Sequence, residues 1–223
     1  MPPDRDLPSL RPLGDESGNQ VLHFVFEDVA PFSRRIVTVR VDLALAESAN
    51  AVPDEDLSTY LLSDLNIESE APDILRLAEF LKSDSAAGTA RRIFEWVAAN
   101  VEYSGYLRED RGGLRALRSR KGDCTEYASL FVALSRASGI PAVVVSGYVY
   151  AGASVLRPDD FHAWAEFWEG RKWQVSDPQR EAFNQRVLDY VALRRTGREP
   201  NHGIPNMHRF RASGGVLAAM LQP

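Results

Sequence analysis

The period of apolar and polar positions changes along this chain of 223 residues. Residues 1–20 are rich in proline, glycine and acidic side chains without any period, which predicts a flexible lead-in. Alternating apolar and polar positions then predict a β-hairpin with strands at residues 21–27 and 35–45. Residues 51–71 are acidic and rich in turn-forming residues, so we expect a linker that leads to a helical part of the chain.

Helical spacing of apolar residues begins at Pro72, a residue that suits the first position of a helix. A second helix is predicted over residues 86–101 by the same spacing. Residues 108–121 combine many basic side chains with two glycines, which indicates a flexible basic loop. The remaining predicted elements are a buried strand at 142–150, a helix at 181–195 and one or two strands at 208–221.

A helix that begins at Cys124 is apolar on nearly every face, so we expect other elements to enclose it. Asp123 is the predicted N-cap, and Glu126 follows three residues later, as in a capping box. Gly139 and Pro141 mark the end of this helix. The pattern therefore predicts a central helix with Cys124 at its N-terminal end.

Cys124 is the only cysteine, which excludes an internal disulfide and a cysteine-rich zinc site. The free N–H groups and the positive dipole end of the first helical turn favour a thiolate, so Cys124 is a candidate nucleophile. A lone cysteine is also commonly a small buried apolar residue. The helix taken by itself leaves both interpretations open.

Two strands predicted at residues 161–168 and 171–177 favour the nucleophile. If a two-residue turn joins them, His162 lies directly opposite Asp177. A four-residue loop, Glu169 to Lys172, keeps the two side chains on one face in a diagonal position. A three-residue loop without a bulge would separate them.

His162 taken alone would usually be a structural histidine, and Asp177 before a proline would usually end a strand. Together with Cys124 they supply a nucleophile, a base and a group that orients the base. This combination predicts an active site, in which Tyr103 and Trp164 are candidates for an oxyanion donor or for pocket-lining residues.

Several blocks of sequence carry a resemblance to a known family. They are Arg120 to Ala128, Ser135 to Ala142 with Gly147-Tyr148 after it, His162-Ala163-Trp164, and Asp177-Pro178. In these blocks the chain resembles the transglutaminase-like superfamily of bacterial proteins, over residues 65–178. One departure is Val143, which stands where many relatives carry an arginine.

The resemblance implies an α+β, papain-like fold in which the cysteine helix packs on an antiparallel sheet. The N-terminal β-hairpin, which the strand pattern predicts, would be an annex to this core. It implies that Cys124 is the nucleophile, His162 the general base and acid, and Asp177 the residue that orients the imidazole. The expected domains are a lead-in at 1–20, an N-terminal β segment and linker at 21–65, and a catalytic core at 66–223.

The predicted activity is thiol-dependent acyl transfer from a carboxamide, either a protein glutamine or a peptide amide, through a Cys124 thioester. The acceptor would be an amine or water, and the chemistry requires no metal or other cofactor. A cysteine peptidase or amidase would use the same triad. A protein-binding module that retains the fold without catalysis is the third alternative, with the N-terminal hairpin making the protein contacts.

Charge and hydropathy limit the partners. The net charge of -5 and a pI near 5.5 argue against general nucleic-acid binding. No apolar stretch approaches the length of a membrane span, and no signal-peptide pattern opens the chain. We therefore expect a cytoplasmic protein, or an exported one if a signal has been removed, that acts on a protein or peptide substrate.

Overall fold

The computed structural model describes residues 11–14, 19–23, 33, 36, 56–107, 110–150, 160–185 and 189–196. The chain divides into two compact units, residues 1–45 and residues 46–223. All of the predicted site residues belong to the second unit.

In the first unit, strand β1 (Arg11–Gly14) pairs antiparallel with β2 (Gln20–His23). The expectation of a flexible lead-in is therefore wrong for Arg11–Gly14, because the pairing partner lies just beyond the proline- and glycine-rich stretch. The expected strand at 35–45 lies outside the described residues, apart from Ile36, and the expected domain limits stay predictions.

The second unit is a layer of helices on an antiparallel sheet. In the described residues this sheet has five strands in the order β8-β7-β6-β5-β9, and all four neighbouring pairs are antiparallel. The expected α+β arrangement is confirmed. The elements in chain order are η1 (Leu57–Leu61), α1 (Pro72–Leu81), α2 (Ala86–Asn100), β3 (Glu102–Tyr103), α3 (Gly112–Ser119), β4 (Lys121–Gly122), α4 (Cys124–Ala137), β5 (Ala142–Val149), β6 (Phe161–Trp168), β7 (Trp173–Asp177), β8 (Ala182–Phe183) and β9 (Tyr190–Arg195).

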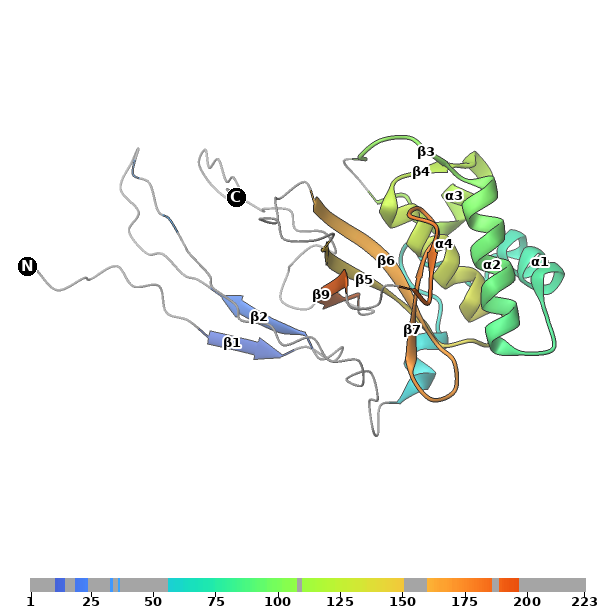
Figure 1. Cartoon of the computed structure of the whole chain (residues 1–223), viewed down its shortest axis with the longest axis horizontal. Helices are drawn as coiled ribbons and strands as arrows, with labels where there is room; N and C mark the ends of the chain where they lie inside the picture. Colours follow the sequence, from blue (N-terminus) through green and yellow to red (C-terminus); the bar gives the residue numbers. More distant parts are fainter. Residues whose placement is uncertain are drawn as a thin grey trace, which may run out of the picture. The chain divides into compact units, whose positions relative to one another are not determined.

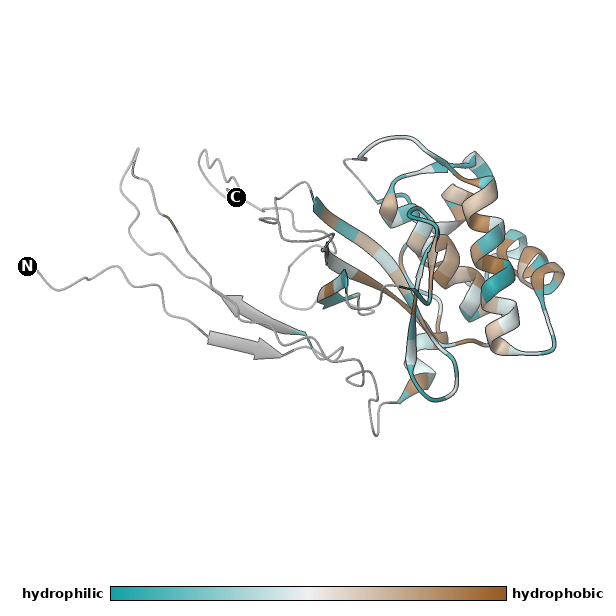
Figure 2. Ribbon diagram, viewed as in Figure 1, coloured by the Kyte–Doolittle hydropathy of each residue, from teal (hydrophilic) through white to brown (hydrophobic). Residues whose placement is uncertain are grey.

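Helix α4 lies between the sheet and the other three helices (Figure 1). Its side chains are buried from Thr125 to Arg136, as the all-round apolar pattern predicts. Figure 2 shows apolar residues along α4 and along β5, on which it packs. Because α4 is enclosed, its N-terminal end is held at a fixed place relative to β6.

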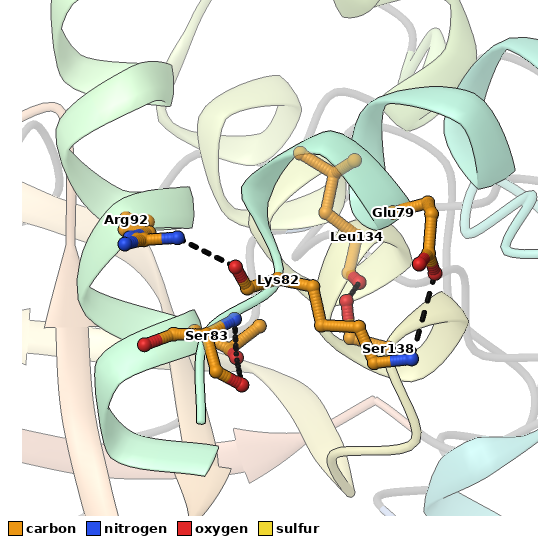
Figure 3. A network of polar contacts seen from close by, with 7 residues as sticks. Glu79, Lys82, Ser83, Arg92, Leu134 and Ser138 are labelled. Atoms are coloured by element: carbon orange, nitrogen blue, oxygen red, sulfur yellow. Dashed lines mark hydrogen bonds and ion pairs between the residues drawn. The ribbon is translucent and has the colours of Figure 1, made fainter. Parts of the chain in front are cut away.

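The C-terminal ends of α1 and α4 are held by polar contacts away from the sheet (Figure 3). Arg92 Nη1 donates to the carbonyl oxygen of Lys82 at 2.6 Å, and Lys82 Nζ lies 3.5 Å from Glu79 Oε2. Ser138 Oγ donates to the carbonyl oxygen of Leu134 at 2.8 Å. The Arg92 bond satisfies a carbonyl group at the C-terminal end of α1, and the Leu134 carbonyl accepts from both the side chain and the backbone N–H of Ser138.

Helix α3 replaces most of the basic loop expected at residues 108–121, so that prediction is wrong. Gly113 explains the error, because a Cβ atom at this position would lie 2.9 Å from the carbonyl oxygen of Ser129 and 3.0 Å from Leu130 Cα. The glycine permits α3 to approach α4 closely rather than marking a flexible loop.

The helix expected at residues 181–195 is also wrong, since β8 and β9 occupy this region. Strand β9 pairs with β5, with Tyr190 beside Val149 and Val191 beside Tyr148. Strands β5 and β9 both begin with continuous apolar runs, and long-range pairing outweighs the local helical pattern here.

Candidate active site

The connection between β6 and β7 decides how His162 and Asp177 are placed. Trp168 pairs with Trp173, so the loop has four residues, and Glu169 N donates to the carbonyl oxygen of Lys172 at 3.1 Å. Of the two even-length loops considered, the four-residue loop with its diagonal placement is the one observed. His162 Nε2 lies 2.7 Å from Asp177 Oδ2, and both side chains are buried.

This contact fixes which imidazole nitrogen is free. A carboxylate can only accept, so the hydrogen must be on His162 Nε2 and the lone pair of the neutral ring is on Nδ1. Asp177 Oδ2 also accepts from the Tyr190 hydroxyl at 2.9 Å, and Asp177 Oδ1 accepts from Arg180 N at 3.2 Å. The site thus contains a base with one nitrogen anchored and the other available.

Cys124 is the first residue of α4, and the predicted capping box is present around it. Asp123 N donates to Glu126 Oε2 at 3.0 Å, and the Asp123 side chain accepts from the backbone of the first turn. The same two buried carboxylates reach the preceding segment, because Leu107 N donates to Asp123 Oδ2 and Arg111 N donates to Glu126 Oε1, both at 2.8 Å. The helix end and the segment that precedes α3 are therefore joined.

The thiol of Cys124 is directed at the start of β6. Its sulfur accepts a hydrogen bond from the backbone N–H of Ala163, the residue after His162, and another from the Thr125 side chain. Within the described part of the chain, no hydrogen bond joins the sulfur to the His162 ring. The structure thus joins His162 and Asp177 directly and brings Cys124 to the adjoining backbone.

Burial is the largest influence on the ionisation of this thiol. Burial, together with the negative charge of Asp123, raises the pKa of Cys124 to about 11, against the smaller lowering by its two hydrogen bonds. The sequence-based expectation that the helix end favours a thiolate is therefore not met in this structure. Burial thus opposes the thiolate that the helix end favours, and a protonated sulfur is the form that this raised pKa implies near neutral pH.

The two candidates for the oxyanion donor differ in exposure. Tyr103 pairs with Gly122 in the parallel β3–β4 ladder, beside the N-cap of α4, and is 52% exposed. Trp164 is fully buried, and its ring is stacked on that of His162 with centroids 6.4 Å apart. Tyr103 is thus accessible to a substrate, whereas Trp164 packs against one face of the imidazole ring. The oxyanion role stays a prediction for both.

Tyr190 is a site residue that sequence reasoning missed. Its hydroxyl contacts Asp177, but the segment that carries it was expected to be helical and received no role. The available signal was the short continuous apolar run Tyr190-Val191-Ala192-Leu193, which fits a strand as well as a helix.

Val143 is buried in the apolar cluster that also contains Trp164 and Val175. An apolar residue therefore fills the position at which the resemblance suggested an arginine. Over the described ranges, no group of three or more His, Cys, Asp or Glu side chains is arranged to hold a metal ion. None of the helices in those ranges is long and apolar enough to cross a membrane.

Residues 76–178 match the transglutaminase-like superfamily. A Pseudomonas aeruginosa protein named protein-glutamine gamma-glutamyltransferase is 37% identical over 76 residues, which cover 31% of this chain and 11% of that protein. An uncharacterised Mycobacterium leprae protein is 30% identical over 91 residues, 39% of this chain and 32% of that one. The solved structure of a proposed cysteine protease from Cytophaga hutchinsonii is 27% identical with a TM-score of 0.54, covering 66% of this chain and 50% of that chain.

This chain therefore spans 11% and 32% of the length of the two curated relatives and half of the solved structure. The matched segment contains Cys124, His162 and Asp177 and ends directly after the last of them, so Tyr190 lies outside it. The expected resemblance and the papain-like arrangement are confirmed. Residues 76–178 are therefore similar to the transglutaminase-like superfamily, and the similar proteins are named as a glutamyltransferase and a proposed cysteine protease.

Proposed function

We propose that this chain catalyses acyl transfer from a carboxamide, either a protein glutamine side chain or a peptide amide, through a thioester on Cys124. The observation that carries the proposal is the buried hydrogen bond between His162 and Asp177. Cys124, the first residue of α4, is bonded to the backbone of Ala163, the residue after His162. A nucleophile, a base and an orienting carboxylate are the groups that such a reaction needs. The P. aeruginosa relative is named for this kind of reaction.

The first half of the reaction starts from the neutral thiol. His162 Nδ1 accepts the proton from Cys124 as the sulfur forms a bond to the carbonyl carbon, so the ring becomes an imidazolium. Asp177, bonded to Nε2, stabilises the positive ring. The imidazolium then gives its proton to the departing nitrogen as the C–N bond breaks, and ammonia or an amine leaves behind a thioester.

The second half reverses the proton movements. An amine or water gives its proton to His162 while it attacks the thioester carbon, and the imidazolium returns that proton to the sulfur as the C–S bond breaks. The negative oxygen that forms in each half requires donors. The backbone N–H of Cys124, free in the first helical turn, is one candidate, and the exposed Tyr103 hydroxyl is a second.

A hydrolytic activity, that of a cysteine peptidase or amidase, is the second candidate, because the Cytophaga structure is described as a proposed cysteine protease. Hydrolysis differs from acyl transfer to an amine only in the acceptor of the thioester, which is water. The two are separated by incubating the protein with a glutamine-containing peptide and a fluorescent primary amine, and by measuring released ammonia and incorporated amine in parallel.

If the protein is a transferase, the amount of incorporated amine should approach the amount of released ammonia. If it is a hydrolase, ammonia should be released without amine incorporation. Cys124→Ala and Asp177→Asn should abolish or strongly reduce both signals. Asp84→Asn is the matched control for the second variant, because Asp84 is exposed between α1 and α2. Wild-type protein that gives neither signal with protein or peptide amides would overturn the proposal in favour of a binding module.

A further inference from the structure

The Asp177 carboxylate is only 1% exposed, and three hydrogen-bond donors surround it. His162 Nε2 and the Tyr190 hydroxyl both reach the same oxygen, Oδ2, at 2.7 Å and 2.9 Å, while Arg180 N reaches Oδ1 at 3.2 Å. A carboxylate buried to this degree requires such partners. Tyr190 is the side-chain donor that the triad does not account for.

The Tyr190 ring is held by its surroundings. It begins β9, lies opposite Val149 in the ladder with β5, and packs edge-on against Trp164, with ring centroids 5.1 Å apart and planes at 65°. Trp164 in turn stacks on His162. One buried indole thus contacts both aromatic rings that reach Asp177, so the phenol is positioned by the sheet rather than by a loop.

Gly147 on β5 makes this approach possible. It pairs with His162 on one side, and on the other side the β5–β9 register shifts between Ser146 and Gly147. A Cβ atom at this position would lie 2.0 Å from the carbonyl oxygen of Val191 and 3.1 Å from Trp164 Cη2. Only a glycine therefore lets β9 close onto β5 at the level of the site.

We propose that Tyr190 is a positioning residue that acts through Asp177. By donating to Oδ2 it holds the carboxylate against rotation and shares the oxygen to which the imidazole is anchored, and this fixes the orientation of the His162 ring and leaves Nδ1 available as the base. The assignment rests on the proposed function of the His162–Asp177 pair. It adds to that site a residue from a strand outside the family match at residues 76–178.

The kinetic test compares Tyr190→Phe with Tyr148→Phe in the full chain, using the glutamine peptide and amine described above. Tyr190→Phe removes one hydrogen bond to a charged group and should lower kcat about tenfold. KM should not change, because Tyr190 is buried and by this proposal acts through Asp177 rather than on the substrate. Tyr148→Phe removes a phenol from the neighbouring strand that packs on Phe161 instead, and kcat should stay at the wild-type value.

A spectroscopic test is independent of turnover. The proton on His162 Nε2, assigned by its loss in His162→Gln, gives a downfield NMR resonance that reports on its bond to Asp177. In Tyr190→Phe this proton no longer shares Oδ2, so its resonance should move further downfield; 3-fluorotyrosine at position 190, a stronger donor, should move it upfield. Tyr148→Phe should leave it in place.

The outcomes separate the two proposals. A shifted resonance in a protein without acyl-transfer or hydrolase activity would retain the Tyr190 assignment and reject the proposed function. The assignment would be overturned if the resonance is unchanged in both Tyr190→Phe and the protein with 3-fluorotyrosine at position 190. Equal losses of kcat in Tyr190→Phe and Tyr148→Phe would also overturn it. If Tyr190→Phe does not fold, the fluorotyrosine protein decides through its resonance.

Discussion

Alkylation of Cys124 across pH measures how far burial opposes ionisation of its thiol. The pKa of Cys124 is raised to about 11 by burial and by the neighbouring Asp123 charge, whereas a free cysteine ionises near pH 8.5, as a rough reference value. A raised pKa keeps the thiol protonated as the pH increases, so the reactive thiolate stays scarce until the pH approaches the raised value.

The size of the effect follows from the two ionisation constants. At pH 7.5 the thiolate fraction should be about 300-fold smaller than in a free cysteine, since the two pKa values differ by roughly 2.5 units. The alkylation rate should therefore be about 300-fold slower if nucleophilicity and access are unchanged. It should continue to rise from neutral pH to the alkaline limit of the folded state.

The assay is pseudo-first-order alkylation by iodoacetamide, followed by mass spectrometry. All labelling reports on one site, because Cys124 is the only cysteine. The control is the same chain unfolded in urea, where the inflection should return to roughly pH 8.5. An inflection below that value in the folded protein, lost in His162→Ala, would show a thiolate–imidazolium pair and refute the reasoning from burial.

Two further substitutions test the support of the site. Burial raises the pKa of Glu126 to about 7, so its contribution to stability is complete below its unfolded value of about 4.3 and is lost as the pH rises through about 7. Glu126→Gln should flatten this dependence in urea unfolding, and a retained slope would contradict it. The amide has one acceptor oxygen in place of two, so either Asp123 N or Arg111 N loses its acceptor, which should cost about 1 kcal/mol. Gly113→Ala places a Cβ atom 2.9 Å from the Ser129 carbonyl oxygen and should lower the free energy of unfolding by roughly 1–3 kcal/mol; an unchanged urea midpoint would show that α3 can move away without loss.

The sequence by itself determined the elements whose signals are short in range. The N-cap Asp123, the capping partner Glu126 and the stop at Gly139 predicted α4 with the limits that are observed, because a helix end is encoded within a few residues. The alternation in the two strands placed His162 and Asp177 on one face for any loop of even length, since side chains repeat every two residues in a strand.

Tertiary structure decided the features that depend on distant neighbours. Gly112 and Gly113 suggested a loop, but Gly113 instead permits the close approach of α3 to α4. The segment containing Tyr190 forms a strand because it pairs with the edge of β5. Enclosure of Cys124 reversed the effect expected from its helix end, since desolvation depends on everything packed around the sulfur. Local patterns thus placed the triad candidates along the chain, while packing set the environment in which each of them must react.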